Sequence, residues 1–103
     1  ARAEGDEDAA YLEYLAIARG ALGMLEAAGE AAEQLQGLKG AVAPWSVARA
    51  WASAGEASLA VRYLQVAFEQ RSSSIPFLGV TPVFSRLLEL SEVRQLMEQA
   101  GLP

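Results

Sequence analysis

Residues 43–68 decide the fold of this chain, and they read APWSVARAWASAGEASLAVRYLQVAF. Gly55 divides this stretch into two segments, each with apolar residues at the three- and four-residue steps of an amphipathic helix. The first segment carries Val47, Ala48, Trp51 and Ala54, and the second carries Leu59, Ala60, Tyr63, Leu64, Ala67 and Phe68. The pattern predicts two antiparallel helices joined at Gly55.

Length and charge limit the possible partners. A chain of 103 residues is expected to form one domain and to bury about two thirds of its unfolded surface. Its net charge of −5 argues against nucleic acid and anionic membranes, because phosphate binding requires a cationic surface. No apolar run approaches the ~20 residues that a membrane span requires.

The chemistry available to the chain is also limited. It has no cysteine and no histidine, so the commonest catalytic bases, nucleophiles and zinc ligands are missing. Glu26, Glu30 and Glu33 share one face of an expected helix, but the Glu-x-x-His pairs of carboxylate-bridged metal sites are absent. We therefore expect a solvated acidic face, no metal, no cofactor and no enzymatic activity. The run Ser72-Ser73-Ser74 reads as a connector.

Composition gives weaker indications of origin. Arginine outnumbers lysine seven to one, Lys39 being the one lysine, and alanine is abundant, which suggests a GC-rich bacterial source. The absence of cysteine and of a signal peptide agrees with a cytoplasmic protein. Because the first residue is Ala1, we expect a piece of a longer protein.

The N-terminal half predicts another pair of helices. Residues 1–7 are small and acidic and are expected to be frayed, and residues 8–40 are expected to form the first hairpin. Its helices cover residues 8–21 and 24–39, and Gly40 stops the second one. Gly29 lies inside that helix at a cost of about 1 kcal/mol, so a break there is the main alternative.

The second hairpin is expected to cover residues 43–71, and Pro44 suits the first turn of its first helix.

The C-terminal part predicts a shorter pair of helices over residues 81–100. Thr81-Pro82 reads as an N-cap followed by proline at the first helical position, and Ser91 as the N-cap of the last helix. The apolar residues expected inside are Val83, Phe84, Leu87, Leu88, Val93, Leu96 and Met97.

The two hairpins repeat. Gly23 and Gly55 are 32 residues apart, close to the ~34 of a tetratricopeptide repeat (TPR). The small and large positions of that repeat are matched in the second copy by Ala48, Trp51, Ala60, Leu64 and Ala67, and less faithfully in the first by Ala16, Ala28, Ala32 and Leu35. Arg19 stands where an aromatic residue is usual. On these residues the chain resembles the TPR family, with a degenerate first repeat.

The end of the chain resembles a C-terminal extension of some bacterial TPR proteins. The matching segments are residues 42–45, 54–55, 81–88 and 101–103. Thr81 and Leu88 replace the aspartate and arginine of that extension, so a salt bridge between them is absent. The resemblance implies an all-α fold: two antiparallel helix pairs and a shorter capping pair in an α-α superhelix.

The resemblance also implies that the first helix of each hairpin lines a concave face. There Trp45, Arg49 and Ser53 recur at four-residue steps, and Glu13 and Ile17 form the corresponding stripe of the first helix. A tryptophan beside an arginine suits recognition of a peptide carboxylate or carbonyl. The alternatives are that Trp45 packs on the preceding hairpin with Arg49 solvated, or that this face mediates self-association.

The expected function is accordingly a non-enzymatic scaffold that binds a peptide or a neighbouring domain. A structural homo-oligomerisation domain is the second hypothesis. A small-molecule sensor, with Trp45 and Trp51 near an apolar pocket between the hairpins, is the third.

Overall fold

Two helical hairpins and a C-terminal segment make up the fold. The computed structural model describes residues 4–38, 42–71 and 75–101. These ranges are all-α, as expected, and hold no strand. The α-helices are α1 (Glu4–Ala21), α2 (Leu25–Gln36), α3 (Pro44–Ser53), α4 (Ala57–Glu69) and α5 (Ser91–Gln99), and the 3-10 helices are η1 (Ile75–Val80), η2 (Pro82–Phe84) and η3 (Leu87–Glu89).

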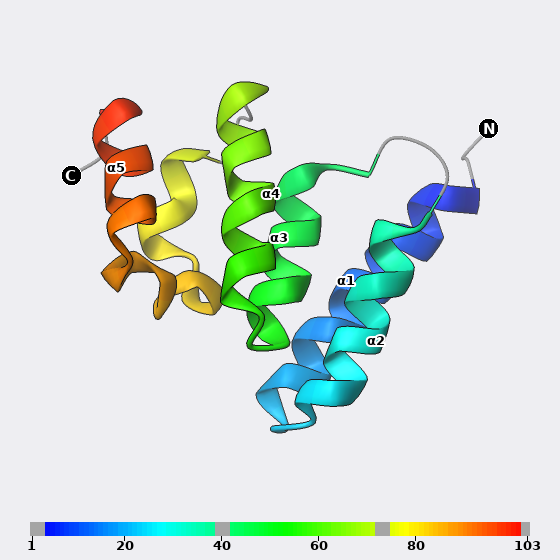
Figure 1. Cartoon of the computed structure of the whole chain (residues 1–103). Helices are drawn as coiled ribbons and strands as arrows, with labels where there is room; N and C mark the ends of the chain where they lie inside the picture. The colour runs from blue at the N-terminus through cyan, green and yellow to red at the C-terminus, as the bar shows by residue number, and fades with distance from the viewer. Residues whose placement is uncertain (1–3, 39–41, 72–74, 102–103) are drawn as a thin grey trace.

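The elements follow one another across the molecule in chain order. Figure 1 shows α1 beside α2 at one end, α3 beside α4 in the middle, and α5 at the other end. Helix α3 packs against both helices of the first hairpin, and on its other side it contacts α4 and η2. The molecule extends over 36 × 34 × 19 Å, so it is about two helix diameters thick.

The two hairpins close with the same turn. At the end of α1 the Gly23 N–H donates to the Gly20 carbonyl and the Met24 N–H donates to the Arg19 carbonyl. Thirty-two residues later, the N–H groups of Gly55 and Glu56 repeat these two bonds. This is a Schellman motif, which requires a left-handed residue, and Gly23 and Gly55 have φ of +79° and +78°. The glycine spacing read from the sequence therefore marks two equivalent turns.

The core is built largely from alanine. Fully buried alanines occur on the first four helices: Ala16, Ala28, Ala31, Ala32, Ala48, Ala50, Ala60 and Ala67. Small side chains allow the helix backbones to approach closely. Larger side chains that are also fully buried, including Leu35, Leu64 and Phe84, fill the remaining space.

The first hairpin differs from expectation at its ends. Helix α1 begins at Glu4, so residues 4–7, which were expected to be frayed, are helical. Acidic residues at the positive end of the helix dipole favour this extension. Helix α2 continues through Gly29 without a break and ends at Gln36, followed by Gly37. The expected stop at Gly40, and Lys39, lie outside the described residues.

The C-terminal segment differs more. A helix was expected to start at Pro82, but the chain forms the short 3-10 helices η2 and η3 there. Thr81 does not cap a helix, because its hydroxyl donates to the Phe77 carbonyl at 2.7 Å. Pro76 and Pro82 lie at the starts of η1 and η2, where a missing N–H is tolerated, and the chain forms short 3-10 turns there instead of a continuous α-helix. Ser91 was expected to be the N-cap of the last helix, but it is the first residue of α5, and Leu90 occupies the N-cap position without a side-chain cap.

Helices α1 and α3 meet backbone to backbone. A Cβ added at Gly20 would collide with the Ser53 carbonyl oxygen and would lie 2.9 Å from its carbonyl carbon. A Cβ added at Gly29 would meet only the Ala54 Cβ, at 4.0 Å, which is an ordinary contact. Gly20 and Gly29 thus have different roles, since Gly20 is required by packing and Gly29 is not.

We expect the matched variants Gly20→Ala and Gly29→Ala to change stability in opposite directions. Gly20→Ala should lose about 1–3 kcal/mol as an overpacking substitution, whereas Gly29→Ala should gain up to about 1 kcal/mol from helix propensity. Urea unfolding followed by circular dichroism measures both changes. Equal effects of the two substitutions would contradict the close approach of α1 and α3.

Candidate interaction site

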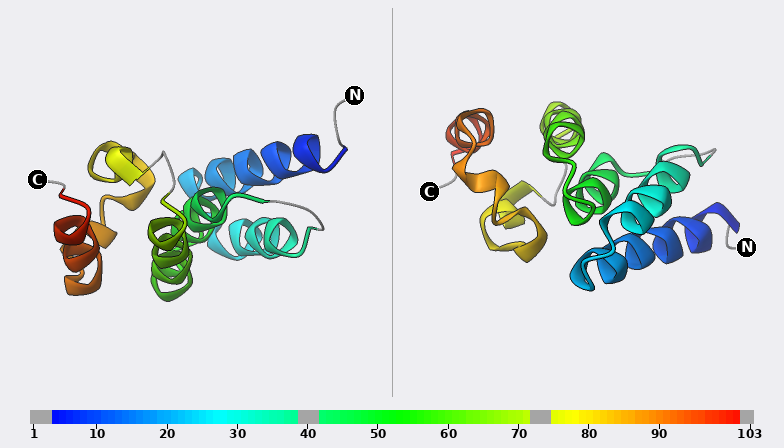
Figure 2. Two further views of the ribbon diagram at one scale, coloured as in Figure 1. Left: turned by 90° about the horizontal axis from the view of Figure 1, so that it is seen from above. Right: turned by 60° about the horizontal axis from the view of Figure 1, so that its bottom comes forward.

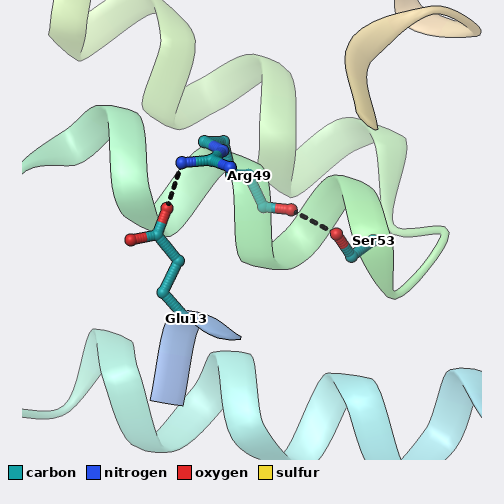
Figure 3. A network of polar contacts seen from close by, with 3 residues as sticks. All are labelled: Glu13, Arg49 and Ser53. Atoms are coloured by element: carbon teal, nitrogen blue, oxygen red, sulfur yellow. Dashed lines mark hydrogen bonds and ion pairs between the residues drawn. The ribbon is translucent and has the colours of Figure 1, made fainter. Parts of the chain in front are cut away.

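A charged pair joins the two helices that were expected to line the binding face. Arg49 Nη1 of α3 lies 2.9 Å from Glu13 Oε2 of α1, as Figure 3 shows. The Glu13 side chain is 17% exposed and that of Arg49 is 36% exposed. The sequence placed these residues on corresponding stripes that both line a ligand-binding face, and the structure pairs them with each other instead.

The pair is held by charge more than by directed hydrogen bonds. Within the described residues, Glu13 Oε2 and Arg49 Nε are buried and have no well-aligned hydrogen-bond partner. Such a half-exposed ion pair stabilises a fold by about 1 kcal/mol or less. Glu13 is the more buried partner. Removal of Arg49 would therefore leave a poorly solvated carboxylate, whereas removal of Glu13 would leave a guanidinium that water can reach.

Ser53 continues the line of polar groups along α3. Its hydroxyl donates to the Arg49 carbonyl at 2.9 Å, one helical turn earlier (Figure 3). This bond satisfies the hydroxyl inside the helix and leaves its lone pairs available.

Trp45 does not share this face, and the expectation that it lies in a groove is wrong. The residue is 8% exposed and belongs to the core, where its ring meets Phe84 edge to face with centroids 5.0 Å apart. At 3.6 residues per turn, each four-residue step advances ~40° beyond a full turn, so Trp45 and Ser53 are ~80° apart around α3. Trp45 therefore points toward η2, while Ser53 points toward α1. It packs on Phe84 of the segment that follows the second hairpin.

Trp51 is also buried and 8% exposed. Its indole N–H donates to Gln36 Oε1 of α2 at 2.9 Å, which links the two hairpins. Arg19, at the equivalent position of the first hairpin, donates from Nη1 to the Ala27 carbonyl at 2.9 Å. The arginine thus spans its hairpin where an aromatic residue was expected.

Ile17 and Ser53 line a pocket where α1, α3 and η2 meet. This junction pocket has a volume of about 460 Å³. Its walls include Ile17 and Ala21 of α1, Ser53 of α3, and Pro82, Val83 and Arg86 of the C-terminal segment. Gly20 also lines it, so the close approach of the helices forms part of its wall. The pocket can accept an apolar side chain, with hydroxyl and guanidinium groups beside it for a carbonyl or carboxylate.

Sequence reasoning missed the C-terminal contribution to this site. Val83 was expected to face the core, and Arg86 received no role. The exposed side chain of Arg86 reaches the pocket because residues 82–86 fold as tight turns against α3. A continuous helix, as predicted, would have placed these residues differently.

A second and larger pocket, of about 840 Å³, lies between α4, η1 and α5. Phe68, Ile75 and Leu96 line it together with Gln99 and Arg71. Neither pocket is lined by Trp45 or Trp51, so nothing in their placement favours a tryptophan-lined small-molecule site.

The acidic residues of α2 lie apart from both pockets. Glu26, Glu30 and Glu33 are exposed. Within the described part of the chain, no group of three or more His, Cys, Asp or Glu side chains is placed to hold a metal ion. Of the helices in the same ranges, none combines the length and apolar character needed to cross a bilayer.

In comparison with known proteins, no protein-family model, curated protein or solved structure matches this chain.

We expect Trp45→Ala and Trp51→Ala to destabilise the fold to a similar, large extent. Each substitution truncates a core side chain and should cost about 3–5 kcal/mol. The free energy of unfolding from denaturant titration measures the loss. If Trp45→Ala were nearly as stable as the wild type, the packing of Trp45 against Phe84 would be contradicted, and the Trp45 side chain would have to be exposed.

The charged pair should respond asymmetrically to substitution. Arg49→Met leaves a largely buried carboxylate without its cation and should cost about 1–3 kcal/mol. Glu13→Gln keeps the shape of the side chain and leaves a half-exposed guanidinium that water can solvate, so its cost should be below about 1 kcal/mol. Urea titrations of the two variants test this order, and a larger loss for Glu13→Gln would contradict it.

Proposed function

We propose that this chain is a TPR-like interaction module that binds an extended peptide segment at the junction pocket. The pocket carries the proposal, because it lies where the first helices of both hairpins meet the segment that follows them. It combines apolar walls with the polar side chains of Ser53, Ser85 and Arg86. These suit a small apolar side chain flanked by a backbone carbonyl or a carboxylate.

Two features of the fold support the TPR-like part of the proposal. The hairpins repeat with a 32-residue period, and they close with the same hydrogen-bonded glycine turn. In addition, α3 packs on both helices of the preceding hairpin, as a stacked repeat requires. Stacking of this kind places the first helices side by side and creates a continuous surface for a ligand.

The charged residues near the pocket limit which ligands it can bind. Arg49 is neutralised by Glu13, whereas Arg86 is exposed at the pocket. A ligand carboxylate would therefore be held by Arg86, because Arg49 is paired with Glu13 and does not line the pocket. We accordingly propose a peptide with an acidic residue or a C-terminal carboxylate next to a small apolar side chain.

A matched pair of variants tests this function. Ala21→Trp/Arg86→Glu fills the pocket and reverses its charge at two exposed positions, so the fold should remain intact. Ala57→Trp/Arg62→Glu makes the same substitutions at exposed positions of α4 that line neither of the two pockets and serves as the control. Peptides are selected from a random displayed library with the wild-type domain, and their affinities are measured by calorimetry.

Selected peptides should share an apolar residue next to a carboxylate. They should bind the wild type and the control equally, and the pocket variant at least ~10-fold more weakly. Equal binding of all three proteins would place the peptide elsewhere and refute the junction pocket. Failure to select any peptide against the folded wild-type domain would count against a peptide-binding function.

A further inference from the structure

Three large apolar side chains are exposed in the turn between α1 and α2. Leu22, Met24 and Leu25 are 76%, 50% and 52% exposed. Leu25 is the first residue of α2, and Met24 occupies the N-cap position without a side-chain hydrogen bond. Polar residues such as serine or aspartate are usual at an N-cap, because they satisfy free backbone N–H groups. The turn therefore exposes apolar surface where helix capping favours a polar residue.

The equivalent turn of the second hairpin lacks this surface. Gly23 and Gly55 occupy the same place in the two turns, so Met24 corresponds to Glu56, and Leu25 corresponds to a small alanine. Both turns form the same hydrogen bonds around a left-handed glycine. The geometry of the turn therefore does not require methionine and leucine. Departures from local sequence rules of this kind occur at functional sites.

Leu25 stands between two hollows of the surface. It lines the junction pocket, and it also lines a second, shallow hollow of about 590 Å³. We call this second one the outer hollow, and its lining residues are Gly23, Met24, Leu25, Glu26, Ala27 and Glu30. Gly23, like Leu25, lines both hollows. The junction pocket and the outer hollow therefore form one continuous path that passes over Leu25.

The Leu25 side chain reaches from the first turn to the second. A Cβ added at Gly55 would lie 3.5 Å from Leu25 Cδ1. Gly55 has a φ of +78°, which favours glycine, so no side chain at that position covers the leucine. About half of the Leu25 side chain remains exposed. A ligand that leaves the junction pocket along this path therefore meets an apolar surface that is held in place by both hairpins.

Charged residues set the direction in which a ligand crosses Leu25. Arg86 lines the junction pocket from the C-terminal segment, whereas the outer hollow, on the first hairpin, carries the exposed Glu26 and Glu30. Both views in Figure 2 show the second hairpin between the first hairpin and the C-terminal segment. Arg19 donates to the Ala27 carbonyl but does not line the outer hollow. A ligand carboxylate is therefore attracted to the Arg86 end of the path and repelled from the other end.

We infer that the peptide of the proposed function carries a second apolar residue, which packs on Leu25 and Met24 while its carboxylate binds Arg86. The first apolar residue, in the junction pocket, then lies between the carboxylate and the second one. Leu25 is accordingly a specificity-determining residue of the site. This inference rests on the proposed function, because it assigns a direction and a further anchor to the same ligand.

A double-mutant cycle tests the inference with peptides selected on the wild-type domain. Leu25→Gln replaces the leucine by a polar side chain of similar size at an exposed position. Leu22→Gln makes the same substitution in the same turn, at a residue that lines neither hollow, and is the control. Each protein is titrated by calorimetry with a selected peptide and with a form of it whose second apolar residue is replaced by glutamine.

The selected peptides should share the second apolar residue, on the side away from the carboxylate. Leu25→Gln should weaken the binding of such a peptide about 10-fold, whereas Leu22→Gln should leave it unchanged. The glutamine form of the peptide should bind the wild type and Leu25→Gln equally, because the contact has already been removed.

The source of the carboxylate is tested with two further peptides. One has an amidated chain end, and the other has its acidic side chain replaced by the corresponding amide. One of the two should bind the wild type at least ~10-fold more weakly, which identifies the carboxylate that Arg86 holds. Full affinity of both peptides would overturn the assigned direction.

The remaining outcomes separate this inference from the proposed function. Equal binding of a selected peptide by the wild type and Leu25→Gln would overturn the inference, as would an equal loss in Leu22→Gln. If Ala21→Trp/Arg86→Glu still weakened the same peptide, the junction pocket would remain its binding site. If neither that variant nor Leu25→Gln weakened binding, both the inference and the proposed function would be wrong.

Discussion

The backbone contact between Gly20 of α1 and Ser53 of α3 is the constraint on which the rest of the structure depends. Without a side chain at Gly20, the two helices approach closely enough for Glu13 and Arg49 to pair across them. The same approach forms one wall of the junction pocket. The alanine-rich interior follows from it, because helices this close leave room only for small side chains between their backbones.

The features that depend on local sequence could be predicted. Both hairpins and their turns were expected from helical periodicity and from Gly23 and Gly55, and these depend on neighbouring residues alone. The C-terminal segment could not be predicted in detail. A proline after a threonine reads as a helix start, but the Thr81 hydroxyl bonds back to Phe77 and the chain turns again within a few residues.

The candidate site was predictable where it depended on one helix pair. Glu13 and Arg49 were expected on corresponding stripes of one binding face, where they instead pair with each other, and Ile17 and Ser53 do line a common pocket. Trp45 was placed wrongly because a four-residue spacing drifts around the helix, and because the sequence did not reveal that Phe84 would return to cover it. Arg86 was missed for the same reason: its position depends on how a distant segment folds back on α3.

The two glycine turns have a consequence for how the chain folds. Each turn brings the two helices of a hairpin together within a few residues, so each pair can form from contacts between residues close in sequence. Proteins dominated by such local contacts fold in microseconds to milliseconds, because little loop-closure entropy is lost before contacts form. Docking of α3 on the first hairpin would then join two hairpins that have already formed. The order of the hairpins along the chain thus also describes a simple route by which the fold assembles.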